Sequence, residues 1–166
     1  MPRTRKDAKS NRFLVIIIGG AIIAATIGIS FMLVTQATNS DNYVRTIQSI
    51  SDQSRALTHT YENSFAKWRA GEIGTEEMLR VTDIQLENLE GLVTKLKNTE
   101  PPEKFRLAHE LSILSLNQEL QSDMHIRNYI ETGNDDEYQR SEELLQKALD
   151  YETQAFEEFS RASKNT

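Results

Sequence analysis

The chain has 166 residues, a net charge of −6 at pH 7 and no cysteine, which excludes disulfides, thiolate metal sites, covalently attached c-type haem and a lipid-modified cysteine anchor. Its length suits one domain with a short appendage. The charge is divided unevenly, because residues 1–12 carry +4 and the residues after Val34 carry −10, and so acidic a domain lacks the positive surface that binds nucleic acid.

A membrane-spanning helix is predicted between Phe13 and Val34. The sequence FLVIIIGGAIIAATIGISFMLV has 22 residues and no charge, and at ~1.5 Å per residue it is long enough to cross a hydrocarbon core of about 30 Å. Residues 1–12 form a basic stub before it, so the positive-inside rule places the stub in the cytoplasm and the residues after position 35 outside the cell membrane. No second apolar run follows, which predicts a single-pass protein.

The competing interpretation of this segment is a signal peptide, with Thr35-Gln36-Ala37 as a weak cleavage site. The apolar run exceeds the ~7–15 residues typical of signal peptides, so an uncleaved anchor is favoured. Within the span, Gly20, Ala24 and Gly28 recur every four residues on one face, where small side chains let two helices approach closely. This face is a candidate for pairing with a second copy or a partner subunit, although Gly and Ala are also common in membrane helices.

Residues 43–166 are predicted to form an outer domain of four amphipathic helices, joined to the span by a connector at residues 35–42. The connector contains neither Pro nor Gly, so the membrane helix can continue into the first outer helix, over residues 41–70. Gly71 and Gly74 end that helix. Its apolar seam, at alternating steps of four and three, comprises Tyr43, Ile47, Ile50, Ser54, Leu57, Tyr61, Ser64 and Trp68.

The second helix is predicted to begin with Thr75 as its N-cap and to stop by Asn98 or Thr99, because a proline disfavours helix in the residue before it. Pro101 and Pro102 then start the third helix, since a proline fits the first turn of a helix, where its missing N–H has no intrahelical partner. The seam of the second helix comprises Leu79, Thr82, Leu86, Leu89, Val93 and Leu96.

The third helix is predicted to carry two apolar stripes and to end at Gly133. Asn134, with Glu137 three residues later, matches the spacing of a capping box that starts the fourth helix. The first stripe comprises Phe105, Ile113, Leu116, Leu120 and Met124, and the second comprises Leu107, Leu111 and Leu114. The seam of the fourth helix comprises Tyr138, Ser141, Leu145, Ala148, Ala155, Phe159 and Ala162.

Short connections make neighbouring helices antiparallel, so the predicted fold class is all-α: a transmembrane helix followed by an up-down-up-down four-helix bundle. The Gly71 and Gly133 turns then lie far from the membrane, and the Pro101–Pro102 turn lies near it. At the distal end Trp68 either caps the core, which is favoured, or forms an exposed contact patch with Tyr129 and Tyr138.

The sequence offers little chemistry. His59, His109 and His125 have no Glu three residues earlier, so the ferritin-like di-iron signature is absent. Nucleophile-elbow, Walker A and HExxH motifs are also absent, and the acids of NDDEY lack the spacing of a calcium loop. We expect no enzymatic activity, metal or cofactor; a b-type haem held by Met124 with His59 or His109 is the least favoured alternative.

From Thr99 onward the chain resembles a loose group of prokaryotic membrane-tethered helical proteins of undefined function. In these, a P-P-x-x-aromatic-x-x-x-H pattern opens a long helix and a Gly-Asn/Asp turn precedes the last helix. The matching residues are Pro101, Pro102, Phe105, His109, Gly133, Asn134 and Asp135. The resemblance implies an extracytoplasmic bundle. The architecture is also similar to a chemoreceptor sensory domain, but no second span or output domain follows.

Two functional hypotheses follow. The leading one is a non-enzymatic single-pass membrane protein whose outer bundle binds a protein partner, or a second copy, in assembling a membrane complex. The alternative is a sensor or carrier that holds a small-molecule ligand between its helices, favoured by the polar seam residues Ser54, Ser64, Thr82 and Gln118. His109, one turn after Phe105, is predicted to pack beside it and to donate a hydrogen bond across the seam, with ligand binding as the minority interpretation.

Overall fold

The outer domain is a bundle of long helices. The computed structural model describes residues 40–164, and the predicted membrane helix, the stub and the pairing face Gly20, Ala24 and Gly28 lie outside this range. The helices are α2 (Ser40–Ala70), α3 (Thr75–Lys97), α4 (Arg106–Thr132) and α5 (Asp135–Lys164), with a 3₁₀ turn, η2 (Glu103–Phe105), before α4. Over residues 40–164 there are no strands, which confirms the all-helical class, and none of these helices is long and apolar enough to cross a membrane.

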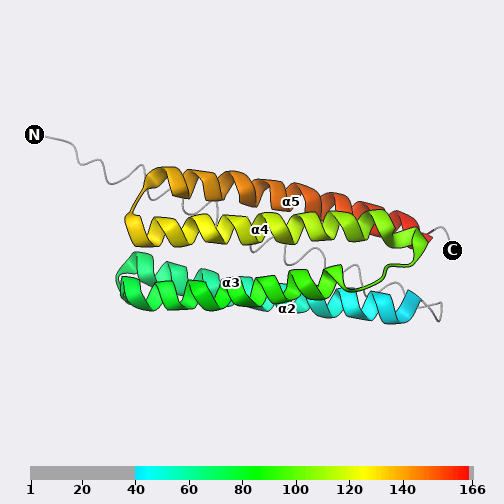
Figure 1. Ribbon diagram of the computed structural model, residues 1–166, viewed down its shortest axis with the longest axis horizontal. Helices are drawn as coiled ribbons and strands as arrows, with labels where there is room; N and C mark the ends of the chain where they lie inside the picture. Colours follow the sequence, from blue (N-terminus) through cyan, green and yellow to red (C-terminus); the bar gives the residue numbers. More distant parts are fainter. Residues whose placement is uncertain (1–39, 165–166) are drawn as a thin grey trace, which may run out of the picture.

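Consecutive helices run in opposite directions (Figure 1). The turns at Gly71 and Gly133 lie at one end, and the α3–α4 link, the start of α2 and the end of α5 lie at the other. We call these the glycine end and the proline end. α4 packs along both α3 and α5, and α2 packs along α3, but within the described residues α2 and α5 share no comparable interface. The side of the bundle between α2 and α5 is therefore the least closely packed.

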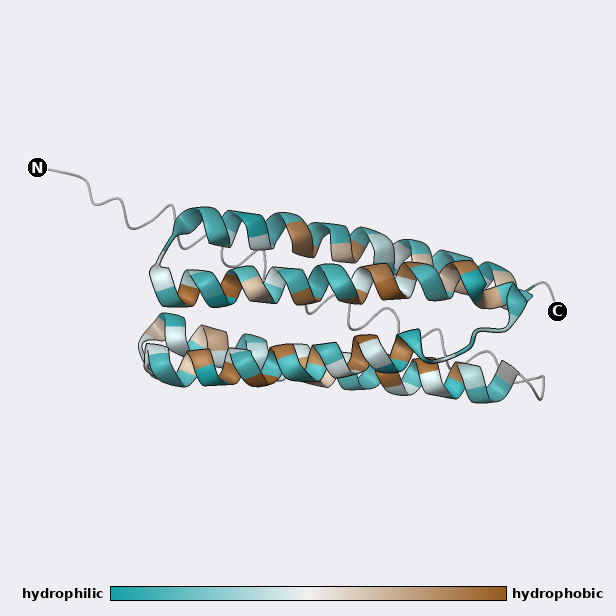
Figure 2. Ribbon diagram, in the orientation of Figure 1, coloured by the Kyte–Doolittle hydropathy of each residue, from teal (hydrophilic) through white to brown (hydrophobic). Residues whose placement is uncertain are grey.

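Apolar residues alternate with polar ones along every helix (Figure 2), and the buried ones form three groups along the bundle. Tyr43, Phe105 and Phe159 pack together at the proline end. Leu92, Leu96 and Leu116 belong to the middle group, with Ile50 and Val93. Tyr61, Met78 and Ile130 pack at the glycine end. Every predicted seam residue of α2, α3 and α5 is buried or half-buried, as the periodicity requires.

Three predicted apolar positions of α4 are wrong. Leu107, Leu114 and Met124 are 53, 42 and 45% exposed. The arc of α4 that α3 and α5 cover instead includes His109, Ser122 and Asp123, which are all buried. The apolar residues of this helix span a wider arc than its neighbours cover, so sequence alone did not show which part faces inward.

Helix ends agree with prediction more closely than the caps do. Gly133 ends α4 with a left-handed φ of 70°, and α3 stops at Lys97 with Asn98 as its C-cap. Thr75 is not an N-cap, since Gly74 holds that position and the Thr75 hydroxyl accepts a hydrogen bond from Trp68 Nε1 at 3.3 Å. The prolines lie just before η2 rather than inside α4, with Pro102 as the N-cap of that 3₁₀ turn.

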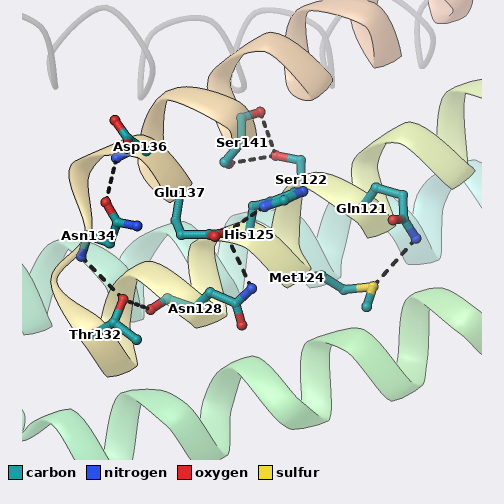
Figure 3. A network of polar contacts seen from close by, with 10 residues as sticks. All are labelled: Gln121, Ser122, Met124, His125, Asn128, Thr132, Asn134, Asp136, Glu137 and Ser141. Carbon is teal, nitrogen blue, oxygen red and sulfur yellow. Dashed lines mark hydrogen bonds and ion pairs between the residues drawn. The ribbon is translucent and has the colours of Figure 1, made fainter.

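The capping box predicted at the start of α5 is also wrong. Asn134 Oδ1 accepts a hydrogen bond from the Asp136 N–H at 3.1 Å, and the Asn134 N–H donates to Thr132 Oγ1 at 3.2 Å. The Glu137 carboxylate turns to α4 instead, where it bonds to His125 and Asn128 (Figure 3). A tertiary contact therefore replaces the local one.

Candidate ligand-binding cavity

A cavity of about 160 Å³ lies between α2, α4 and α5, on the loosely packed side of the bundle. Its wall near the proline end is apolar and aromatic and includes Tyr43, Ile47, Phe156 and Phe159. Towards the middle of the bundle the lining becomes polar. A body of hydrocarbon therefore fits at one end of this cavity and a polar group at the other.

Three charged side chains converge on the polar end from three helices: Arg55 from α2, Glu119 from α4 and Glu152 from α5. The Thr58 hydroxyl donates to Glu119 Oε1 at 2.9 Å, which ties α2 to α4 at this level. Arg55 makes only a long ion pair, from Nη1 to Asp52 Oδ1 at 3.8 Å. Its Nε and Nη2 atoms are buried without a hydrogen-bond partner, an arrangement that native proteins rarely leave without a reason.

The carboxyl groups at this level hold their protons more tightly than usual. Burial raises the pKa of Glu152 to about 7, the Glu119 carboxylate raises it further and Arg55 opposes the rise. Burial also raises the pKa of Glu119, against the hydrogen bond from Thr58, and the carboxylate of Glu62 adds to the rise. Perturbed carboxyl groups beside a cavity are a common mark of a functional site.

A second acid continues this polar layer towards the glycine end. Asp123 is buried and accepts a hydrogen bond from Gln85 Nε2 at 3.2 Å. Burial raises its pKa well above its usual range, with a further contribution from Glu119 and opposition from the Gln85 amide. Beside it, the hydroxyls of Thr82 and Tyr61 lie 3.3 Å apart. Asp123, unlike Glu152, has its hydrogen-bond partner within the bundle.

The polar seam residues that suggested a ligand site are only partly gathered at this cavity. Ser54 lines it. The Ser64 hydroxyl bonds to the Thr60 carbonyl on its own helix, Thr82 bonds to Met78 and Tyr61, and Gln118 is not part of the lining. The residues that matter most, Arg55, Glu119 and Glu152, were missed because charged residues on helices were taken as a solvated face.

One signal in the sequence pointed to Glu152. The predicted seam of the last helix steps by three or four residues except between Ala148 and Ala155, where seven residues separate them. Glu152 lies at the missing position, four residues after Ala148 and three before Ala155. A charged residue in register with a buried stripe is the pattern that could have identified it.

His109 is buried at the proline end, where its Nδ1 lies 3.2 Å from the Tyr43 hydroxyl. Tyr43 also stacks on Phe105, with ring centroids 5.5 Å apart. His109 therefore pairs across the seam as predicted, and it is not part of the cavity lining. Burial lowers its pKa, which favours the neutral ring in this packed position.

At the glycine end the structure brings Trp68, Tyr129 and Tyr138 together. The Trp68 and Tyr129 ring centroids are 6.0 Å apart, edge to face, and those of Tyr129 and Tyr138 are 5.2 Å apart. All three side chains are half-buried, and Trp68 packs on the buried group around Tyr61. The cluster combines features of both predicted roles, a cap on the core and a partly exposed aromatic surface.

The residues considered for haem do not meet. His109 and Met124 lie 15 residues apart on α4, about 22 Å along the helix, and Met124 Sδ accepts a hydrogen bond from Gln121 (Figure 3). His59 is exposed on α2 and bonds to Asn63 at 3.2 Å. Within residues 40–164 no group of three or more His, Cys, Asp or Glu side chains is arranged to hold a metal ion.

Comparison with known proteins adds no relative: no family model, curated protein or solved structure matches this chain.

Proposed function

We propose that this protein is a membrane-anchored sensor or carrier whose extracytoplasmic bundle binds a small molecule between α2, α4 and α5. The observation that carries the proposal is the cavity, which joins an aromatic end to a polar end with unsatisfied donors on Arg55. Binding sites in helical bundles typically lie between helices and combine an apolar lining with a few convergent polar groups.

The test is a thermal-shift screen of the full chain in nanodiscs against small apolar amines, alcohols and carboxylates. A ligand at 100 times its dissociation constant adds ~2.7 kcal/mol to the free energy of unfolding, so a clear rise in melting temperature is expected for at least one class. Ala148→Leu, which fills the cavity, should abolish the rise. The exposed Ala66→Leu, also a change from Ala to Leu in a helix, is the matched control. A screen without any shift would contradict the proposal.

The membrane anchor is a separate part of the proposal. It rests on the uncharged run from Phe13 to Val34 and on the basic residues before it. Because the chain has no cysteine, single cysteines report topology cleanly. In intact cells a membrane-impermeant maleimide should label Glu157→Cys, on the exposed face of α5, and leave Lys6→Cys unlabelled until the membrane is opened. The reverse pattern would contradict the orientation.

A second candidate function is protein assembly, favoured by the exposed Leu107 and Leu114. These side chains lie seven residues apart on α4, on one face of the helix, and exposed apolar surface of this kind can mark a contact with a partner or a second copy. Sedimentation of the chain in detergent tests this. A Leu107→Glu/Leu114→Glu variant should dissociate any dimer, and a wild-type monomer that co-purifies with no partner would contradict it.

A further inference from the structure

Building on the proposed function, we propose that the ligand is a small amphipathic amine. Its ammonium lies between Glu119 and Glu152, and its apolar body lies against Ile47, Phe156 and Phe159. The inference concerns the chemical class of the ligand and can fail while the cavity still binds another molecule.

The charge of the cavity favours a cation. Its lining has two carboxyl groups, Glu119 and Glu152, and one guanidinium, Arg55, so it is short of one positive charge when both acids are ionised. The nearby Glu62 and Asp123 increase the negative potential, as their effect on the pKa of Glu119 and their own raised pKa values show. A bound ammonium balances the lining, whereas a bound carboxylate leaves three negative groups against Arg55.

Arg55 does not neutralise either carboxylate through a hydrogen bond. Its Nε and Nη2 are buried without a partner, and its one ion pair is with Asp52, 3.8 Å away. Glu152 likewise makes no hydrogen bond among the described residues, while lining the cavity. The acceptors that face the cavity thus remain available to a donor such as R–NH₃⁺, which carries three N–H groups in a small volume.

The size and shape of the cavity limit the apolar part of the ligand. Its volume of about 160 Å³ is close to that of an engineered apolar cavity of about 150 Å³ that binds benzene. Aromatic side chains from α2 and α5 line the proline end, and Glu152 lies only four residues, or one helical turn, from Phe156. A ring or short chain joined to its amine by one carbon spans this distance.

The probes are benzylamine, benzyl alcohol and benzoate, which share one ring and differ mainly in charge. Calorimetric titration of the full chain in phosphatidylcholine nanodiscs, with empty nanodiscs as the blank, should show benzylamine binding at least tenfold more tightly than benzyl alcohol, and benzoate most weakly. Glu152→Gln should weaken benzylamine at least tenfold and leave benzyl alcohol unchanged. Glu157→Gln, an exposed change on the same helix, should alter neither.

Proton exchange gives an independent measurement. Glu152 faces Arg55 from α2 and Glu119 from α4, and at pH 7 about half of it is protonated in the empty cavity. An ammonium favours the ionised carboxylate, so benzylamine binding should release protons, seen as an enthalpy that differs between phosphate and Tris buffers with the sign of release. Release should disappear in Glu152→Gln.

The outcomes separate the two proposals. If benzyl alcohol or benzoate binds as tightly as benzylamine, or if benzylamine binds with no proton release, the amine assignment is wrong and the cavity remains a ligand site. If Ala148→Leu leaves benzylamine binding intact, the amine binds elsewhere and the assignment is again wrong. If none of the three binds and the broader screen gives no shift, the proposed function fails as well.

Discussion

Buried polar groups occur in two regions of this bundle and differ in how completely they are paired. Near the glycine end, the Ser122 and Ser141 hydroxyls lie 2.8 Å apart, and His125 Nδ1 lies 2.6 Å from Glu137 Oε2 (Figure 3). At the cavity, Arg55 keeps two buried donors without acceptors and Glu152 makes no hydrogen bond among the described residues. Both regions join helices, but only the first is complete.

The difference separates polar groups that fix packing from polar groups that await a partner. A satisfied network rigidifies a core and specifies one arrangement of its helices, whereas an unpaired buried group costs free energy unless something else compensates it. The glycine end therefore carries the geometry of the α4–α5 pair, and the cavity tolerates a cost that is consistent with binding. Variants can test each half of this comparison.

The largest expected effect is a contrast between two leucine substitutions on α5. Ser141 and Ala148 are both buried and lie seven residues apart. Ser141→Leu should lower the free energy of unfolding by about 3 kcal/mol, because the larger side chain overpacks the α4–α5 contact and removes the partner of Ser122. Ala148→Leu points into the cavity and should change stability by less than about 1 kcal/mol. Urea denaturation of both variants measures the difference.

Ser141→Ala is the control for that contrast. It removes the same hydroxyl without adding volume, so it should cost only about 1 kcal/mol. If Ala148→Leu proved as damaging as Ser141→Leu, the α2–α5 side would be as closely packed as the α4–α5 contact, and the comparison between the two regions would collapse.

The next effect is a pH dependence from Glu152. Its pKa rises to about 7 in the folded protein from about 4.3 in an unfolded chain, so between these values the folded state binds more protons. Stability from this group therefore falls as pH rises from 4.3 to 7. Glu152→Gln should stabilise the protein by about 1–2 kcal/mol at pH 8 and hardly at all at pH 4.5, measured by denaturation at both pH values.

Glu137, on the same helix, should behave in the opposite way. Hydrogen bonds from His125 and Asn128 lower its pKa, so the stability it contributes is present above its unfolded pKa and is lost as pH falls through the lowered value. Glu137→Gln should therefore destabilise the protein at pH 7 and lose that effect in acid. Identical pH profiles for the Glu137 and Glu152 variants would show that the two sites are not electrostatically distinct.

The sequence alone predicted the elements of the fold closely. Helical periodicity placed α2 within one residue of its start, and Gly133 and the prolines marked the ends of α4 and α3. These features are local, because they depend on backbone conformation and on which side chains recur at 3.6-residue spacing. The predicted capping box failed because Glu137 bonds to another helix, which no local pattern shows.

The cavity could not be predicted in the same way. It exists because α2 and α5 do not close against each other, and the distance between two helices far apart in sequence is a result of the whole packing arrangement. The burial of Glu119 depends equally on which arc of α4 faces inward. Only Glu152 left a trace, as the charged residue at the missing position of its seam.

The smallest expected effect tests the proline end, where His109 resembles the paired groups of the glycine end rather than those of the cavity. Tyr43→Phe keeps the stacking on Phe105 but removes the hydroxyl 3.2 Å from His109 Nδ1. It should lower the free energy of unfolding at pH 8 by about 1 kcal/mol, with no effect on benzylamine proton release. Tyr151→Phe, half-buried on α5 and without a hydroxyl hydrogen bond among the described residues, is the control. A Tyr43→Phe variant as stable as the wild type would show that the His109 contact contributes no net stability, because water satisfies the ring equally well.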